Sequence, residues 1–361
     1  MVAVTRTDKA DAPRREPGES TWLTEARRQI ADPQPSPVCL QLSPDGRTLA
    51  VGTKSGRAIL RHVDSSQDIA SWETVSESVR DSWIHTFDKH ASEHPGDLYA
   101  STIMQLAAEY RAAVHCLAFS PEGAVLAVGT GSGSIQFHTS RGRYVTSWST
   151  GTAPILALRF HEDGRHVGFA TPGQFAVRNL FTEHDDFSEQ FDLGLDSSLY
   201  AVAPDLGSLA VVKDGNVVVH HAGSDATYIW WGQLSHDRIT ALTWSADSTR
   251  LAVANEKGVI QVWIVDDEPQ LTDVKVLPES VCVRNLHAAN GELLALTYDD
   301  DFGGLTLWNA VTGSSTTLSA PGDGPLGPIT TSEIFPRHGL VFLGMATGET
   351  FSLRPEETID P

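Results

Sequence analysis

Residues 114–148, VHCLAFSPEGAVLAVGTGSGSIQFHTSRGRYVTSW, decide the fold of this chain. The stretch divides into four short apolar runs, which are separated by residues 120–123 (SPEG), 130–133 (TGSG) and 140–142 (SRG). Runs this short, interrupted this regularly by Gly, Pro and Ser, are typical of strands joined by tight turns rather than of helices. The stretch therefore predicts a four-stranded antiparallel meander.

The same pattern recurs along the whole chain. Further copies begin at Val38, Ile155, Leu199, Ile239, Val281 and Ile329. Their turn residues Gly123, Gly164, Gly207, Ser248, Gly291 and Gly339 lie 41 to 48 residues apart, which is the period of a four-stranded propeller blade. One such sheet cannot bury both of its faces, whereas several sheets stacked radially bury a continuous core and leave only short edges. Seven copies predict an all-β closed ring.

The pattern V-x-x-L-x-F-S-P-D-G-x-x-L-A-V-G-x-x-x-G resembles the WD40-repeat family, over roughly residues 20–354. The resemblance implies a seven-bladed WD40-type β-propeller, a fold that mostly supplies docking surfaces for other proteins. The family's Trp-Asp pair at the end of the third strand survives only as Trp263-Ile264 and Trp308-Asn309. We therefore expect the family's buried Asp-His-Ser-Trp network to be missing from most blades, and stability to come mainly from apolar packing between sheets.

Composition is consistent with one large soluble domain. The chain has 361 residues, of which 40% are hydrophobic, and its repeat is unbroken, so we expect a single propeller over residues 20–361 after a disordered tail of residues 1–19. A net charge of −20 disfavours nucleic acid and anionic membranes as partners. The three cysteines are predicted to be small buried residues, and the first residues contain no apolar targeting segment, which favours the cytoplasm.

The two ends of the repeat array predict how the ring closes. The last copy ends after its third strand, at residues 351–353, so one strand of the seventh sheet is missing. Residues 22–30 (WLTEARRQI) precede the first copy and have no strands of their own to pair with. We expect them to supply the missing strand by pairing near residues 342–353, and a short helix over the rim is the alternative.

The first repeat is much too long. Gly46 and Gly123 lie 77 residues apart, although the period predicts about 42. Residues 58–63 and 68–72 account for the third and fourth strands, which leaves residues 73–112 as surplus. Two apolar stripes in this segment have helical spacing, and Asp97 is placed to cap the second helix. The stripes are Val75, Val79, Trp83 and Phe87, then Tyr99, Ile103, Leu106 and Tyr110. The surplus predicts a helical hairpin between the first two repeats, and a degenerate eighth blade is the alternative.

Partner contacts are predicted from topology. In a WD40 propeller, the connection from a fourth strand to the next first strand opens on the same face as the loops between second and third strands, and this face most often receives partners. We expect six apolar residues of these stripes to pack the two helices on each other and on the ring, which leaves the charged positions for a protein or peptide partner. The six are Val75, Val79, Trp83, Phe87, Ile103 and Leu106. The candidates are Arg80, His85, Lys89 and Arg111 on the insertion, and Lys54, Lys213, Asp237, Arg238, Glu256, Asp301 and Phe302 on loops.

Catalytic and cofactor motifs are absent from the sequence. It contains no G-x-S-x-G, H-E-x-x-H, Walker or C-x-x-C pattern, so neither a cofactor nor a metal is predicted. Residues 184–186 (HDD) are interpreted as a polar turn, and the acidic residues 299–301 as a solvated loop rather than a calcium site. The favoured function is a non-catalytic interaction scaffold, monomeric by itself or part of a hetero-complex. The alternative is a lactonase-type propeller hydrolase with its site at the channel mouth, which the mainly Ala, Cys, Leu and Val first strands disfavour.

Overall fold

A computed structural model of the chain describes residues 36–94, 97–182, 184–190, 199–223, 227–230, 237–266, 269–277, 281–289, 291–298, 304–318, 328–335 and 340–353. These residues form seven antiparallel sheets and two helices. The seven-bladed propeller predicted from the repeats is confirmed. The sheets form one compact unit and the helices belong largely to a second, so each is described by itself.

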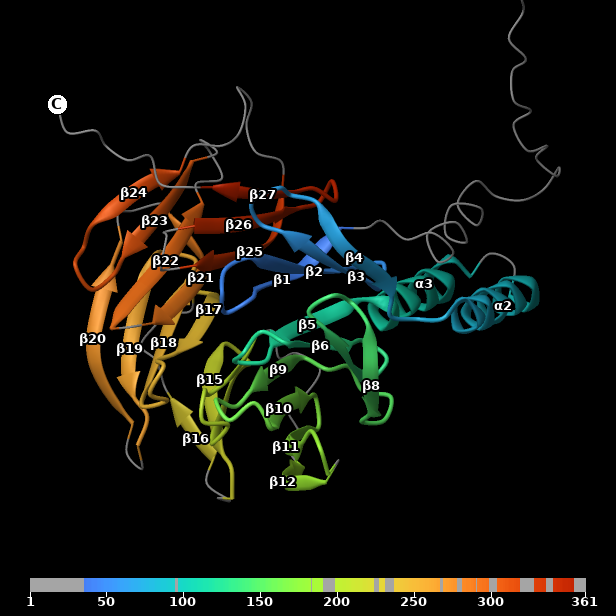
Figure 1. Cartoon of the computed structure of the whole chain (residues 1–361), viewed down its shortest axis with the longest axis horizontal. Helices are drawn as coiled ribbons and strands as arrows, with labels where there is room; N and C mark the ends of the chain where they lie inside the picture. The colour runs from blue at the N-terminus through green and yellow to red at the C-terminus, as the bar shows by residue number, and fades with distance from the viewer. Residues whose placement is uncertain are drawn as a thin grey trace, which may run out of the picture. The chain divides into compact units, whose positions relative to one another are not determined.

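Each of the seven blades follows the order of the chain, and the first six have four strands (Figure 1). Blade 1 consists of β1 Pro37–Leu42, β2 Thr48–Thr53, β3 Arg57–His62 and β4 Asp68–Glu73. Blade 2 consists of β5 Val114–Phe119, β6 Val125–Thr130, β7 Ser134–Thr139 and β8 Tyr144–Ser149. Blade 3 consists of β9 Ala157–Phe160, β10 His166–Thr171, β11 Gln174–Asn179 and β12 Asp185–Gln190. Blades 4 and 5 consist of β13 Leu199–Val202, β14 Ser208–Lys213, β15 Asn216–His221 and β16 Thr227–Trp230; and β17 Ile239–Trp244, β18 Arg250–Asn255, β19 Val259–Ile264 and β20 Gln270–Val276. Blades 6 and 7 consist of β21 Cys282–Ala289, β22 Glu292–Tyr298, β23 Leu305–Asn309 and β24 Ser315–Leu318; and β25 Ile329–Phe335, β26 Leu340–Met345 and β27 Thr350–Leu353.

The turn between the first and second strands is built the same way in several blades. In blade 1, Ser43 Oγ donates to Asp45 Oδ1 over 2.6 Å, and the same carboxylate oxygen accepts the backbone N–H of Arg47. In blade 5, Ser245 and Asp247 repeat this contact over 2.5 Å. Short polar side chains that bond the backbone two residues on are what stabilise such turns. The S-P-D-G pattern in the sequence thus encodes the turn directly.

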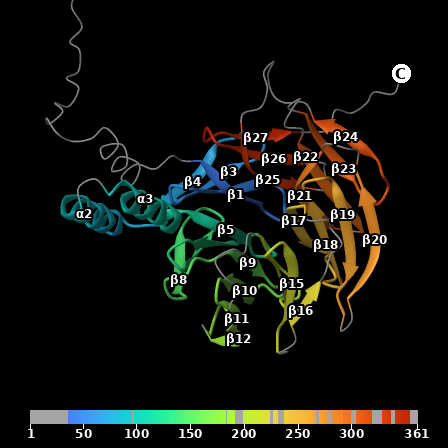
Figure 2. The same ribbon diagram turned by 180° about the vertical axis from the view of Figure 1, so that it is seen from behind.

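The first strands line the centre of the ring. Each contacts the first strands of both neighbouring blades, in the order β1, β5, β9, β13, β17, β21, β25 and back to β1. The first strands that are labelled in the view from behind follow this order (Figure 2). Apolar side chains fill the space between adjacent sheets; between blades 2 and 3, for example, Phe137 and Trp148 pack with Phe160 and Phe169. This is the sheet-on-sheet packing expected from the loss of the Trp-Asp pairs.

Blades 1 and 7 close the ring through direct contacts. Leu42 and Val51 of blade 1 pack against Leu340 and Phe342 of blade 7. Ser36 Oγ also donates to the carbonyl of Ala346 over 2.8 Å. Within the described residues blade 7 has three strands, as the sequence predicts. The predicted fourth strand, residues 22–30, and the predicted tail, residues 1–19, lie outside the described residues.

The surplus in the first repeat forms two helices, α2 Glu77–Glu93 and α3 Leu98–Ala112. No strand occurs in the described parts of residues 74–113, so the helical hairpin is confirmed and the degenerate eighth blade is wrong. Asp97 Oδ1 accepts the backbone N–H of Ala100 over 2.9 Å, which makes Asp97 the predicted N-cap. No helix among the described residues is long and apolar enough to cross a membrane.

The packing within the hairpin differs from the prediction. Phe87 of α2 is buried with Trp83 and Ile84, but its partners on α3 are Met104 and Ala108. The predicted stripe on α3 is instead exposed, because at about 100° per residue Ile103 and Leu106 point away from Met104 and Ala108. Val75 precedes α2, and Val79 is also exposed. The expectation that all of these apolar positions pack the helices is therefore wrong for Val79, Ile103 and Leu106.

Candidate functional site

The loop face combines turns between second and third strands with connections between blades. Lys54 is exposed in the β2–β3 turn, and Lys213 is half-buried at the end of β14. Asp237 and Arg238 lie just before β17, and Glu256 lies in the β18–β19 turn. These five predicted residues are spread over blades 1, 4 and 5, and only those of blade 5 come together. Asp301 and Phe302 lie outside the described residues.

The blade 5 residues form an ion pair beside a hollow. Arg238 Nε lies 3.6 Å from Glu256 Oε2, and the backbone N–H of Glu256 donates to the carbonyl of Arg238 over 3.0 Å. The hollow has a volume of about 440 Å³ and is lined at the starting ends of β17, β21 and β25 by Arg238, Arg284, Asn285, Thr330 and Ser332, among others. Its lining of hydroxyl, amide and guanidinium groups suits a polar segment of a partner chain.

The helical insertion begins and ends on the same loop face. The backbone N–H of Thr74 donates to the carbonyl of Gly56 in the β2–β3 turn, and that of Gly131 in the β6–β7 turn donates to the carbonyl of Ala113. A Cβ at residue 131 would lie 1.9 Å from the carbonyl oxygen of Tyr110, so only glycine fits this close approach. Residues 131–133 thus form the turn between β6 and β7, within the TGSG stretch (residues 130–133) that the sequence predicts to separate two strands.

The predicted charged residues of the insertion are mostly on its surface. His85, Lys89 and Arg111 are exposed, whereas Arg80 is half-buried. Lys89 lies 4.0 Å from Glu93, one helical turn further on, which is a weak surface pair. The surface also includes apolar side chains, since Ile103 is 48% and Leu106 55% exposed. Their apolar spacing predicts packing between the helices, so the sequence pattern does not reveal them as surface residues.

The central channel is more polar than the sequence predicts. The residue of the first strand that pairs with the third residue of the second strand occupies an equivalent position in all seven blades. From blade 1 to blade 7 these residues are Gln41, Ala118, Arg159, Ala201, Thr243, His287 and Glu333. All except Ala201 line one cavity of about 620 Å³. The expectation that the channel offers mainly Ala, Cys, Leu and Val is therefore wrong, because one residue of most first strands turns a polar side chain to this cavity.

Electrostatics in the channel favour the neutral forms of its acid and its imidazole. Burial raises the pKa of Glu333 to about 8, although the backbone N–H of Leu42 partly opposes the shift, and Gln41 Nε2 donates to Glu333 Oε1 over 3.1 Å. Burial also lowers the pKa of His287, and the positive charge of Arg159 lowers it further. Glu333 and His287 are thus largely neutral near pH 7, while Arg159 keeps its charge.

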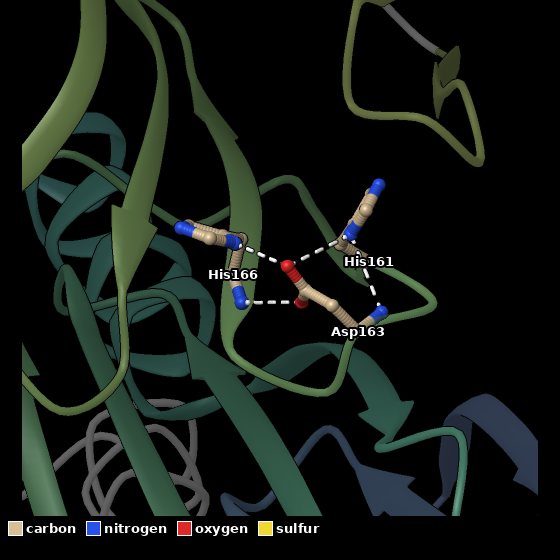
Figure 3. Close-up of side chains that lie close together, drawn as sticks. All are labelled: His161, Asp163 and His166. Carbon is tan, nitrogen blue, oxygen red and sulfur yellow. Dashed lines mark hydrogen bonds and ion pairs between the residues drawn. The ribbon is translucent and has the colours of Figure 1, made fainter.

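A second polar cluster lies in the β9–β10 turn of blade 3, where His161, Asp163 and His166 converge (Figure 3). No side chain of this turn was predicted as a site. The available signal was the replacement of the usual S-P-D-G by residues 161–164, HEDG, followed by His166. Asp186 of β12 contacts His166, so the predicted polar turn at residues 184–186 is instead partly the start of a strand.

The ring of seven antiparallel sheets around a channel makes this protein a seven-bladed β-propeller. The family model described as "Anaphase-promoting complex subunit 4 WD40 domain" matches residues 98–163, and the model described as "WD domain, G-beta repeat" matches residues 232–263. Together with the repeats and the fold, these partial matches support a WD40-repeat propeller, and propellers of this kind are typically protein-interaction scaffolds. No curated protein matches the chain in sequence.

Solved WD40 structures share the fold at low identity. The β-propeller domain of Myceliophteria thermophila Cps50 (Swd1) has a TM-score of 0.61 and 14% identity, over 88% of this chain and 96% of that one. The WD40 repeats of RRP9 have a TM-score of 0.62 and 14% identity, over 89% of this chain and 94% of that one. At this identity, the likeness concerns the fold alone.

Proposed function

We propose that this protein is a non-catalytic scaffold that docks a protein or peptide through its helical insertion and the loop face of its propeller. The observation that carries the proposal is the insertion itself. It interrupts an otherwise regular repeat, it starts and ends on the loop face, and it exposes apolar side chains on a helix. Exposed aliphatic side chains at helical spacing are typical of surfaces that bind another helix or an apolar groove.

The exposed face of α3 supplies the apolar part of the contact. Ile103, Leu106 and Tyr110 follow each other at spacings of three and four residues, which places them on one side of the helix, and all are about half exposed. Arg111, next to Tyr110, and the exposed polar side chains Lys89 and His85 of α2 supply polar contacts. This composition, an apolar centre with a charged rim, is that of a protein interface.

A substitution on this face tests the proposal. We expect the double substitution Ile103→Glu and Leu106→Glu to abolish retention of the partner in an affinity pull-down from the native host. The matched control is Val276→Glu, since Val276 is 71% exposed on the outer strand of blade 5. Circular dichroism and the melting temperature of each variant report on folding.

A deletion gives a second and larger perturbation. Replacing residues 77–109 by a short Gly/Ser bridge keeps Thr74, the buried Val75 and the buried Ala112 and Ala113, which belong to the propeller unit. We expect a folded ring that no longer retains the partner. If both the deletion and the double substitution retain it, the insertion is not the docking site.

The remaining partner classes follow from charge. The net charge of −20 supports a protein partner rather than nucleic acid or an anionic membrane surface. Cys39, Cys116 and Cys282 are all free thiols, which supports a reducing compartment such as the cytoplasm. Fractionation of the native host tests this localisation, and recovery of the protein outside the cytoplasmic fraction would contradict it.

A second candidate function is hydrolysis at the channel mouth, and the polar ring favours it. A carboxyl group with a pKa near 8, a neutral imidazole and a guanidinium group around one cavity could serve as acid, base and anion-binding group. Turnover of a lactone or ester by the purified protein that is lost on Glu333→Gln would establish it. Activity equal in the two proteins, or absent from both, would leave the scaffold as the function.

A further inference from the structure

The β9–β10 turn of blade 3 brings two imidazole rings to one carboxylate. His166 Nδ1 lies 2.6 Å and His161 Nδ1 lies 3.1 Å from Asp163 Oδ2 (Figure 3). His161 directly follows β9, Asp163 lies in the turn and His166 is the first residue of β10. The three potential ligand atoms all lie within 4.8 Å of one another. His161 and His166 are half-buried and Asp163 is exposed, so the cluster is open to solvent on one side.

The other blades show which part of this arrangement belongs to the turn itself. In blades 1 and 5 a serine occupies the place of His161, and its hydroxyl bonds Oδ1 of the turn aspartate. In blade 3 the same oxygen, Asp163 Oδ1, accepts the backbone N–H groups of Arg165 and His166 over 2.7 and 3.1 Å. The turn thus uses Oδ1, while Oδ2 faces the two histidines.

The donors and acceptors of the cluster do not balance. The backbone N–H of Asp163 points at His161 Nδ1 over 3.3 Å, so this nitrogen presents its lone pair. The lone pair also faces Asp163 Oδ2, which is an acceptor. Two electron-pair donors that face each other are stabilised by a cation between them.

The far side of His166 is arranged as in known metal sites. His166 Nε2 lies 2.9 Å from Asp186 Oδ2, on the first residues of β12. A metal-bound histidine usually donates its other ring N–H to a carboxylate, which fixes the tautomer and orients the ring. Asp186 and Asn179, whose Nδ2 lies 3.2 Å from the same ring nitrogen, therefore hold His166 with Nδ1 directed at Asp163.

We propose that His161, Asp163 and His166 bind one divalent transition metal ion, with Zn²⁺ as the best match. Two imidazole nitrogens and one carboxylate oxygen are a zinc ligand set, whereas Ca²⁺ and Mg²⁺ prefer oxygen ligands alone. At zinc–ligand distances of about 2.0–2.2 Å, tetrahedral ligands lie roughly 3.3 Å apart, so the contact between His166 and Asp163 opens by less than about 1 Å. Water fills the fourth position on the exposed side.

Zinc titration of the whole chain, purified without a histidine tag, tests the proposal. His90 in the last turn of α2 and His94 just after the helix stack on each other and offer a competing pair of ligands, so the titrated protein carries His90→Ala and His94→Ala. In this background we expect one Zn²⁺ per chain by calorimetry, with a dissociation constant in the micromolar range, and a melting temperature that rises with zinc.

Two substitutions in this background separate a metal site from a hydrogen-bonded turn. His161→Ser restores the serine of blades 1 and 5, so the turn folds, and we expect it to weaken zinc binding at least tenfold and to abolish the zinc-dependent rise in melting temperature. Glu162→Gln removes an exposed neighbouring acid and is the matched control, with binding unchanged. Equal zinc binding by the His161→Ser variant, or no saturable binding before either substitution, overturns the proposal.

Discussion

The side chain of Glu333 allows a direct measurement of how much a negative charge in the central channel destabilises the fold. We expect the substitution Glu333→Gln to stabilise the ring at neutral and alkaline pH, because an amide keeps an acceptor for Gln41 and carries no charge. Burial raises the pKa of Glu333 from its ordinary 4.5 to about 8. In the unfolded chain the carboxyl group ionises near its ordinary value. Between these two pH values, folding therefore takes up a proton.

The direction and the magnitude of the change in the free energy of unfolding follow from the difference between these two pKa values. Below about pH 4.5 both states carry the proton and the group contributes no penalty. As the pH rises from about 4.5 to 8, the unfolded state binds fewer protons than the native state, so the free energy of unfolding of the natural protein falls by up to ~1.4 kcal/mol per pH unit. The full shift corresponds to ~5 kcal/mol, but the channel admits water to part of the side chain, so we expect about 1–3 kcal/mol.

Urea unfolding followed by tryptophan fluorescence measures this difference at intervals from about pH 5 to about pH 9. The stability gained by Glu333→Gln should grow over this range and level off above about pH 8. Glu122→Gln, at an exposed acid in the β5–β6 turn, is the control and should show no such growth. A gain that does not change with pH, or a natural protein that is the more stable one at pH 8, would refute the reasoning.

Two further predictions concern close packing and thiol chemistry. Gly131→Ala forces a Cβ against the carbonyl oxygen of Tyr110, so we expect a loss of more than about 2 kcal/mol in the free energy of unfolding. Gly304→Ala, which meets nothing within 4 Å, should change it by less than about 0.5 kcal/mol, and a similar loss in both would contradict the packing argument. Desolvation raises the pKa of Cys39 and Cys116. Both thiols should therefore react with Ellman's reagent at pH 8 at least about tenfold more slowly in the folded chain than in the urea-unfolded chain. Equal rates would show that the thiols are not desolvated.

The channel and the β9–β10 turn also bear on how a metal analysis is interpreted. Zinc retained by the natural protein would favour a channel hydrolase only if it persists in the His161→Ser variant, because the proposed turn site does not involve Glu333 or His287. Zinc lost with His161 places the metal in blade 3 and leaves the scaffold function untouched. The two experiments therefore fail or succeed independently.

The sequence by itself determined the architecture. Alternation of apolar and polar residues and the chemistry of S-P-D-G turns are local properties, so most strands and turns could be predicted from their own few residues, although residues 184–186, which the sequence predicts to be a turn, are partly the start of β12. Repetition of this unit then fixed the ring, since a lone sheet of this kind cannot bury its faces. The helical insertion was equally visible, because a break in the period places it between the first two copies, and Asp97 marked the start of its second helix.

Only the tertiary structure decided the sites, since they depend on contacts between residues far apart in the chain. The spacing of apolar residues in α3 could not reveal that Met104 and Ala108, rather than Ile103 and Leu106, pack against α2. Arg159 and Glu333 lie in blades 3 and 7, far apart in the chain, and only the closed ring brings them to one cavity. Asp186 likewise reaches His166 through the pairing of β10, β11 and β12. Packing and register, which are global properties, determine these encounters, and for this reason the fold was predictable and the chemistry was not.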